Sequence, residues 1–502
     1  MGRDPAVSDT ALERKGVPGA ESALAAVRHR VELDRGEAAV ALRVVYAGVA
    51  AYAALFVFAA VIHYLVFQEA RLDLGNMVQT IWNTLHGHVL ELGGPSGSHG
   101  SRLGSHVDPL LVVFVPIFWI SSSPLILLVA QALAVASGAL PVFWLARKHL
   151  GSPRAAAHFA FAYLLYPATQ FNAFTPGDGF HPVSLAVPLV LFAVWFLDED
   201  RLVAFSAVAL LAFSTKEEIP LAVGCLGIWY AVRKGRRLFG ASVFLAGLGV
   251  TLFNFLWVIP HFSPTGVDPF ADRYAGVGGT PSGIAQKAVT DPGALVHAVA
   301  SGHKLGYLLL LLLPSLGLFL LEPLLVLGAV PDLAINLLSS NVNQTSLQFQ
   351  YTAGILPFLV AATVFGAVRL KDRSIDLPLW VLVGAAAVAI YSPLVLSAGD
   401  VRALGSQSVA AKKHALSLVP EGAPVSASTR LAGYLSTRRL IYTFPSVGRA
   451  HWIVVDAADE TYLNQKAYKR IVRRYEASKA WRTVFATDGV VVLRKRGGPT
   501  GK

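Results

Sequence analysis

Long apolar runs separated by short polar turns make up most of this chain. About 20 consecutive apolar residues cross a bilayer as a helix, and Val44 to Val66 fits that length. Ten later runs are similar: Leu125 to Ala146, Ala155 to Gln170, Pro182 to Leu197, Leu202 to Ser214, Ile219 to Val232, Leu238 to Pro260, Leu305 to Leu321, Leu324 to Leu338, Thr352 to Val368 and Leu377 to Leu396. The pattern predicts an all-α polytopic membrane domain with about eleven transmembrane helices.

Basic residues in the short loops indicate how these helices are oriented. The clusters are Arg147/Lys148/Arg154, Arg201, Arg233/Lys234/Arg236/Arg237 and Arg369/Lys371/Arg373. They all fall in the cytoplasm if the N-terminus is inside, as an excess of Lys and Arg in inner loops requires. This topology needs Asp108 to Ile120, which contains two prolines, to be a re-entrant or interfacial helix. Glu322 fits it least well, because it lies in a turn assigned to the inside and has no basic neighbour in the sequence.

The polar and apolar pattern divides the chain into three parts. Residues 1–43 form a charged cytoplasmic tail in which we expect a short helix from Glu21 to Arg35, and residues 44–397 form the membrane domain, with a first outer loop at 67–107. Residues 398–502 carry more charge and shorter apolar runs, which predict a small α/β domain. Its strands are expected at 424–428, 440–444, 452–456 and 490–493, and its helices at 408–418 and 462–480. An odd number of spans places this domain outside the cytoplasm.

Composition narrows the class of protein. The chain has 502 residues, of which 54% are hydrophobic and 15% charged, with a mean hydropathy of +0.54; ordinary soluble proteins are far less apolar. The net charge of +11 is therefore interpreted as a topology signal and not as a nucleic-acid site. Cys225 is the single cysteine, so no intramolecular disulfide can form. The first apolar run follows about 43 polar residues, unlike a cleavable signal peptide, and we expect it to be retained.

Ionisable residues gather at the ends of the runs that this topology places outside, where such groups tend to be functional. Asp73 follows the first span directly and is our candidate for a general base, which must reach the hydroxyl of an acceptor. The alternative is that Asp73 only caps the amphipathic helix expected from Leu74 to Leu85. Asp108 could likewise cap the helix that begins at Pro109.

The remaining candidates suit a phosphate or a sugar. Lys216 could neutralise a phosphate leaving group while Glu217 or Glu218 orients it or binds a divalent cation; the alternative is a turn that pairs only with itself. The other substrate-side candidates are Arg71, His106, Asp178, His181, Gln344 and Tyr351. His-x-Asp at 106–108 is a weak metal signal, and whether a metal is needed stays open. Walker A, Gly-x-Gly-x-x-Gly, His-Glu-x-x-His and cysteine-pair motifs are missing from the sequence, which disfavours nucleotide hydrolysis and zinc-protease chemistry.

These segments, in this order, resemble the bacterial DUF2079 family of membrane proteins, which is grouped with the GT-C superfamily of glycosyltransferases that use polyprenyl-phosphate sugars. The matching stretches are 73–83, 105–106, 131–147, 163–167, 180–182, 216–218, 351–357, 425–427, 442–445 and the strand that ends at Asp456. The resemblance implies a GT-C-like membrane domain, an acidic catalytic residue in the first outer loop and an outer soluble domain. It carries Asp73 over as the base, and Lys216, His181 and His106 as phosphate-side candidates. Many superfamily members have two acidic residues separated by one position, whereas Asp73 has only Glu69 nearby.

We therefore expect a multi-pass protein of the bacterial cytoplasmic membrane, part of the cell envelope, that transfers a sugar from a lipid-linked donor to an acceptor on the outer face. The acceptor could be a glycan, a lipid or a protein, and no nucleic acid is involved. A transporter or flippase of lipid-linked sugars and a non-catalytic cell-envelope scaffold are the alternatives. Transporters commonly show internal repeats and charges near the bilayer midplane, and neither is evident in the sequence.

Overall fold

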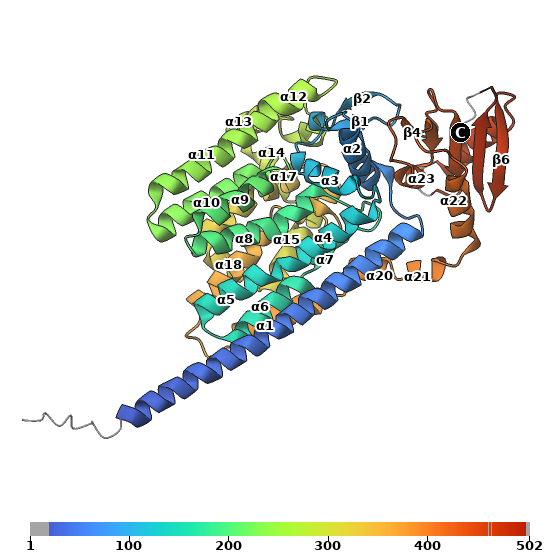
Figure 1. Cartoon of the computed structure of the whole chain (residues 1–502). Helices are drawn as coiled ribbons and strands as arrows, with labels where there is room; N and C mark the ends of the chain where they lie inside the picture. The colour runs from blue at the N-terminus through green and yellow to red at the C-terminus, as the bar shows by residue number, and fades with distance from the viewer. Residues whose placement is uncertain (1–19, 460, 463, 498–502) are drawn as a thin grey trace, which may run out of the picture.

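The computed structural model describes residues 20–459, 461–462 and 464–497. Most of the predicted tail, residues 1–19, lies outside this part of the chain. From residue 20 onward the expected short helix and the first span form one helix of 46 residues, α1 (Ala20–Leu65). Figure 1 shows α1 running along the outside of a helical bundle, with the C-terminal domain beyond its far end.

Every predicted apolar run contains helix. The first half of the bundle consists of α4 (Leu125–Ser137), α5 (Ala139–Leu150), α6 (Pro153–Leu165), α7 (Pro167–Ala173), α8 (Ala186–Asp198), α9 (Leu202–Phe213), α10 (Ile219–Lys234), α11 (Arg237–Phe253) and α12 (Ile259–Phe262). The second half consists of α13 (Pro281–Thr290), α14 (Pro292–Val299), α15 (Gly302–Leu312), α16 (Pro323–Val326), α17 (Val330–Leu338), α18 (Leu356–Arg369), α19 (Leu377–Val388), α20 (Pro393–Leu396) and α21 (Asp400–Ala403).

The expected number of eleven spans is not confirmed. Within the described residues, four helical stretches are long and apolar enough to cross a bilayer, or five if the pair Pro292–Val299 and Gly302–Ser315, bent by 65°, counts as one. The other apolar helices have 10–17 residues. Prolines account for part of the difference, because a proline inside an apolar run interrupts the helical hydrogen bonds; Pro314, for example, lies two residues beyond the end of α15. The stretch Pro109–Phe118 is also short, in agreement with a segment that does not cross.

Ion pairs join helix ends at the side of the bundle that carries the basic loops. Glu322 is 1% exposed and accepts hydrogen bonds from Nε and Nη2 of Arg369 at 3.1 and 2.7 Å. The basic partner that the sequence around Glu322 lacks therefore comes from the end of α18. Lys148 pairs with Asp198 at 2.6 Å, which joins the ends of α5 and α8 in the same way.

The C-terminal part folds as a five-stranded sheet with helices on both faces. The strands are β3 (Val425–Ala427), β4 (Ile441–Thr443), β5 (Trp452–Asp456), β6 (Trp481–Thr487) and β7 (Val490–Lys495), in the order β4-β3-β5-β7-β6. β4, β3 and β5 are parallel, and β7 and β6 are antiparallel to their neighbours. Four strands match the prediction; β6 was missed because its side chains do not alternate between buried and exposed.

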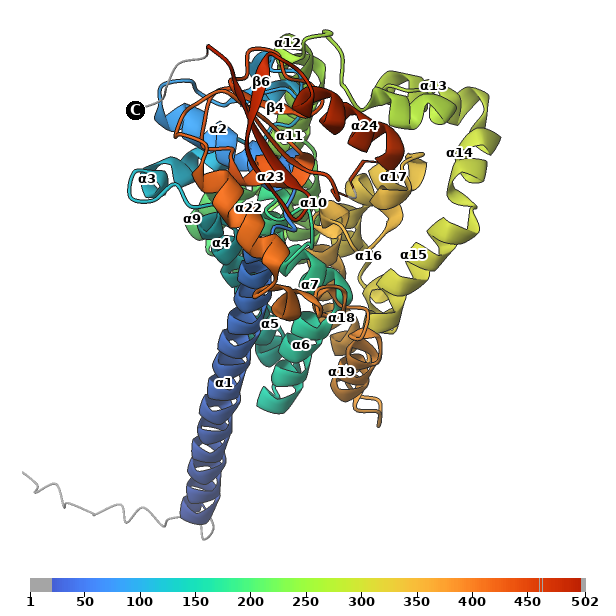
Figure 2. The same cartoon turned by 90° about the vertical axis from the view of Figure 1, so that its right-hand side faces the viewer.

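Each face of this sheet has its own apolar core. On one face, α22 (Gln407–Ser417) and α23 (Thr429–Tyr434) cover side chains such as Val425, Val454 and Val492. On the other face, Tyr468 and Val472 of α24 (Gln465–Glu476) cover Ile453, Val455 and Leu493. Figure 2 shows α22 and α24 on opposite sides of the strands, above the end of α1.

Candidate functional site

A helical turn after α1 holds the first group of candidate residues. Residues Arg71–Gly75 form a π-helical turn, η1, which leads into α2 (Asn76–Leu85), the expected amphipathic helix. Asp73 caps neither element, because the N-cap residues are Ala70 and Gly75. The capping alternative for Asp73 is therefore excluded, and its carboxylate has no hydrogen-bond partner among the residues described.

The Gly177-Asp178-Gly179 turn packs directly against η1. The backbone N–H of Ala70 donates to the Gly177 carbonyl at 3.0 Å, and that of Leu74 donates to the Asp178 carbonyl at 3.1 Å. Gly179 has a φ of 75°, and a Cβ there would lie 2.7 Å from Glu69 Oε2, so only glycine fits. Two loops far apart in sequence thus bring three carboxyl groups together, those of Glu69, Asp73 and Asp178.

These three acids, all outside the spans, hold their protons more tightly than usual. The carboxyl group of Glu69 is fully buried without a hydrogen-bond partner in the described chain, and burial, followed by Asp178 and Asp73, raises its pKa well above the ordinary value. Burial raises the pKa of Asp178 to about 8, and the charge of Asp73 adds to this effect. Burial also raises the pKa of Asp73, but Arg102 and His106 oppose it, and the result is about 6. Near neutral pH, Asp73 is therefore the ionised member of this group.

Arg102 and Asp108 form a buried ion pair beside Asp73. Nε and Nη2 of Arg102 donate to the Asp108 carboxylate at 2.8–3.2 Å, in the two-pronged geometry that Arg and carboxylates favour. Asp108 stands at the N-cap position of the helical turn that follows it, as the capping alternative expected, but its side chain makes no capping hydrogen bond because the carboxylate binds Arg102. Arg102 was not among the predicted site residues, because its role depends on pairing with Asp108, which a spacing of six residues does not indicate.

His106 and Glu217 join the first outer loop to the turn between α9 and α10. His106 Nδ1 lies 3.0 Å from Glu217 Oε1, and the backbone N–H of Val107 donates to Oε2 at 2.9 Å. Burial alone would raise the pKa of Glu217, but His106, Lys216 and the Val107 hydrogen bond lower it to about 2. The Glu217 carboxylate is therefore ionised, and both of its oxygens have hydrogen-bond partners within the protein.

His181 stays neutral at the centre of these groups. Its ring is 4% exposed, and burial, with Arg102, His106 and Lys216 nearby, lowers its pKa to about 3. Its backbone N–H donates to Gln131 Oε1 at 2.7 Å, which fixes the backbone. Nε2 has no hydrogen-bond partner in the described chain, so a neutral ring nitrogen is left to contact a ligand.

Lys216 is surrounded by carboxylates. Its Nζ lies 2.5 Å from Glu218 Oε1 and 5.9 Å from the centre of the Tyr351 ring. Burial lowers the pKa of Lys216, but Glu218, Glu217 and Asp332 outweigh it, so the net shift is upward. Lys216 and Glu218 therefore pair within their own turn, as the alternative proposed. The structure does not leave Lys216 free to bind a phosphate.

Asp332 was missed although the sequence held a signal. It is a buried carboxylate on α17, inside an apolar run, and ionisable residues in such runs merit attention. A Cβ at Gly354 would fall within 1.5 Å of Asp332 Oδ2, so the backbone of the following segment closes directly over this acid.

Arg273, also unforeseen, contacts an aromatic ring and a glutamine and not an acid. Its guanidinium lies 4.3 Å from the Phe270 ring centre, and that ring stacks on His106 at 4.9 Å. It donates to Gln344 Oε1 at 3.5 Å, and Gln344 also contacts Ser339 and Tyr274. No carboxylate of the described chain lies within ion-pair distance of Arg273.

Arg71, a candidate for binding the phosphate, contacts the C-terminal domain and the first outer loop instead. Its buried guanidinium donates to Thr443 Oγ1, to the Gly93 carbonyl and to the Ile441 carbonyl at 2.8, 2.7 and 3.3 Å. Residues two apart on a helical turn do not face each other, which explains why Arg71 and Asp73 diverge. Arg71 thus fastens the C-terminal domain to the first outer loop.

The cluster as a whole contains more acids than bases. Its carboxyl groups belong to Glu69, Asp73, Asp108, Asp178, Glu217, Glu218 and Asp332, and its permanent cations are Arg102, Lys216 and Arg273. Bound protons on Glu69 and Asp178 reduce this imbalance. In the described ranges, 20–459, 461–462 and 464–497, no three His, Cys, Asp or Glu side chains are grouped so that they could hold a metal ion.

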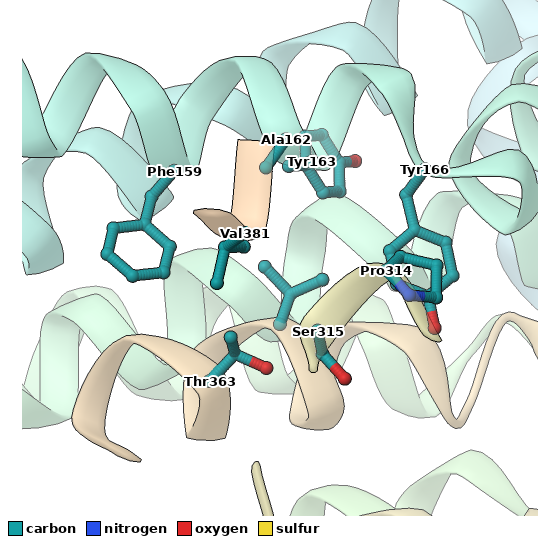
Figure 3. Close-up of a pocket in the computed structure, with 9 residues that line it drawn as sticks. Phe159, Ala162, Tyr163, Tyr166, Pro314, Ser315, Thr363 and Val381 are labelled. Carbon is teal, nitrogen blue, oxygen red and sulfur yellow. The ribbon is translucent and has the colours of Figure 1, made fainter. Parts of the chain in front are cut away.

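A separate apolar pocket lies deeper in the bundle, between α6, α18 and α19 (Figure 3). Its lining includes Tyr163, Tyr166 and Thr363, whose hydroxyls donate to the carbonyls of Val135, Leu311 and Leu359. With these hydroxyls already bonded, the pocket offers an apolar surface and contains none of the charged candidates.

Comparisons with known proteins give one family and a distant structural likeness. A search of curated proteins finds no match. Two crystal structures of ArnT from Cupriavidus metallidurans, one in the apo state and one bound to undecaprenyl phosphate, are similar at 14% identity with a TM-score of 0.47. The apo comparison covers 88% of this chain and 98% of ArnT, and the second covers 89% and 99%. The model of a family described as "Predicted membrane protein (DUF2079)" matches residues 63–492, and the chain therefore belongs to the DUF2079 family.

Proposed function

We propose that this protein is an integral-membrane glycosyltransferase that moves a sugar from a polyprenyl-phosphate donor to an acceptor on the outer face of the membrane. The observation that carries the proposal is Asp73, a partly exposed carboxylate without a protein partner. Arg102 and His106 from the same outer loop lower its pKa, and its charge raises the pKa of Asp178 in another loop. Glu217, Glu218 and Asp108 are engaged in ion pairs and are poorly placed to accept a proton.

In the proposed reaction Asp73 accepts the hydroxyl proton of the acceptor. The acceptor oxygen forms a bond to the anomeric carbon as the bond from that carbon to the phosphate oxygen breaks, and the electron pair leaves with the polyprenyl phosphate. Arg273, with its free guanidinium edge, and the neutral ring of His181 supply hydrogen bonds to that phosphate. A site closed to water strengthens such contacts.

The proposal is tested by replacing Asp73 with Asn. Purified protein in proteoliposomes is given polyprenyl-phosphate sugars in turn with envelope glycans, lipids and proteins as acceptors, and release of polyprenyl phosphate, the product common to all donors, is measured. We expect a loss of at least about a hundredfold, the usual contribution of a general base. Asp272→Asn, at an exposed carboxylate between α12 and α13, is the matched control and should retain activity. An Asp73→Asn variant with full activity would reject Asp73 as the base.

A transporter of lipid-linked sugars is the second candidate. The observation that favours it is Asp332, a buried acid on an apolar helix, linked to Lys216 and Glu218 of another segment. A transporter would move a fluorescent polyprenyl-phosphate sugar across the bilayer without releasing polyprenyl phosphate. Release of polyprenyl phosphate that depends on Asp73, without movement of the lipid-linked sugar across the bilayer, would favour the transferase.

A further inference from the structure

The outer helix of the C-terminal domain carries a row of unpaired cations. Lys466, Lys469, Arg470, Arg473 and Arg474 of α24 are all exposed. Their spacing of three and four residues places them on one side of the helix, while Tyr468 and Val472 are buried on the other. We call these five residues the α24 basic face. At 1.5 Å per residue the row is about 12 Å long.

The charge of this face is not balanced within the protein. None of its five cations lies within ion-pair distance of a carboxylate in the described part of the chain, whereas two other basic residues of the C-terminal part are paired, Arg439 with Glu91 and Lys412 with Asp456. Glu476 is the single acid on α24. A row of like charges costs electrostatic energy when it is left alone, and an anionic partner would relieve that cost.

The surroundings of α24 indicate what the partner is made of. Protein interfaces need a central apolar or aromatic patch, but after Val401 the only large hydrophobic side chain exposed in the described residues is Val484. The aromatic rings of α24 are turned inward, where Tyr475 packs against Phe444 and Trp481. A partner held by charge alone fits this surface better than a folded protein.

The position of α24 disfavours the protein's own bilayer as that partner. The sheet lies between α24 and α23, and α23 is the helix that docks on η1 and on the end of α1, where Tyr434 OH donates to the Tyr64 carbonyl at 2.6 Å. α24 is therefore separated from the end of α1 by the thickness of the sheet. In Figure 2 it lies to the right of the strands, on the side opposite to α22.

From the row of unpaired cations, the lack of an exposed apolar patch and the position on the face of the sheet away from α1, we propose that the α24 basic face binds a polyanionic polymer with repeated phosphate groups. Lys and Arg side chains bind phosphate oxygens through short, charge-assisted hydrogen bonds. This surface is distinct from the Asp73 site, and its role does not depend on the glycosyltransferase proposal.

The test uses the full-length protein in nanodiscs of neutral lipid and fluorescent long-chain inorganic polyphosphate as the probe. We expect binding that weakens about a hundredfold between about 50 and 200 mM salt, as five phosphate contacts imply. The variant K469E/R470E/R473E should weaken binding by at least about tenfold at the lower salt concentration. Dextran, a neutral polymer, should not compete.

A matched control reverses three exposed cations elsewhere in the C-terminal part, R402E/K413E/R449E. It makes the same change in net charge as K469E/R470E/R473E. Polyphosphate binding should stay within about twofold of that of the unmodified protein, because charges outside the binding face act only at long range and are screened by salt. If K469E/R470E/R473E fails to fold, the milder K469Q/R470Q/R473Q reports on the same contacts. Equal losses in both triple variants, or binding to phosphatidylglycerol vesicles without binding to polyphosphate, would overturn the proposal.

Discussion

At the scale of single residues, the central feature is one ionised carboxylate among neutral ones. The pKa of Asp73 is raised from 3.8 to about 6, so it loses its charge as the pH falls through 6, where an ordinary aspartate would stay ionised to about pH 4. If Asp73 is the base, kcat/KM should fall on the acid side of about pH 6.

A variant at His106 tests the cause of this shift. His106 lowers the pKa of Asp73, so His106→Gln should move the acid limb of the pH profile to higher pH. His297→Gln, at an exposed histidine of α14, should leave the limb in place. An acid limb near pH 4 in the unmodified protein would contradict both the environment assigned to Asp73 and its role as the base.

At the scale of elements, a few hydrogen bonds hold the C-terminal domain on the first outer loop. Tyr434 OH donates to the Tyr64 carbonyl at the end of α1 and accepts from the backbone N–H of Glu69. Tyr434→Phe leaves both groups without this partner and should cost about 1–2 kcal/mol. We expect faster protease cleavage in the connection at residues 389–406 and a lower melting temperature. Tyr475→Phe, whose hydroxyl has no hydrogen bond in the described chain, should change neither; an unchanged cleavage rate for Tyr434→Phe would show that docking rests on other contacts.

The elements also show what could be predicted from sequence and what could not. Apolar periodicity located the helices of the bundle and four of the five strands, because burial of one face leaves a local pattern. It overstated the number of full-length spans, since breaks such as that at Pro314 interrupt runs that still look continuous in composition. The β6 strand lies at the sheet edge and is exposed along most of its length, so it leaves no such pattern.

The candidate site likewise contains residues that could be predicted from the sequence and contacts that could not. Asp73, His106 and Asp178 could be found because polar residues at helix ends stand out against apolar runs. Their partners could not, because Arg102 meets Asp108 only through the local fold of one loop, and Gly179 packs on Glu69 only once two distant segments meet. For Lys216, pairing within its own turn was one of the two alternatives, but the contribution of Asp332 could not be predicted, since Asp332 comes from more than 100 residues away.

At the scale of the whole molecule, the charged candidates and the C-terminal domain share one end of the bundle, and the basic loops share the other. Arg71 connects η1 to Thr443 and Ile441, so the side of the membrane that carries the C-terminal domain also carries Asp73. The pairs Glu322–Arg369 and Lys148–Asp198 mark the opposite end. An excess of Lys and Arg there predicts that this end is cytoplasmic.

Single cysteines can test this orientation, because Cys225 is buried and is the only one to remove. In a Cys225→Ala background, Ser417→Cys lies at the end of α22, and Ser374→Cys lies in the exposed loop between α18 and α19. A membrane-impermeant maleimide should label Ser417→Cys on intact cells and Ser374→Cys only after permeabilisation. Both cysteines replace exposed serines, so a difference in labelling reports the side of the membrane and not the burial of the residue. The reverse labelling would place Asp73 in the cytoplasm and remove the basis for transfer on the outer face.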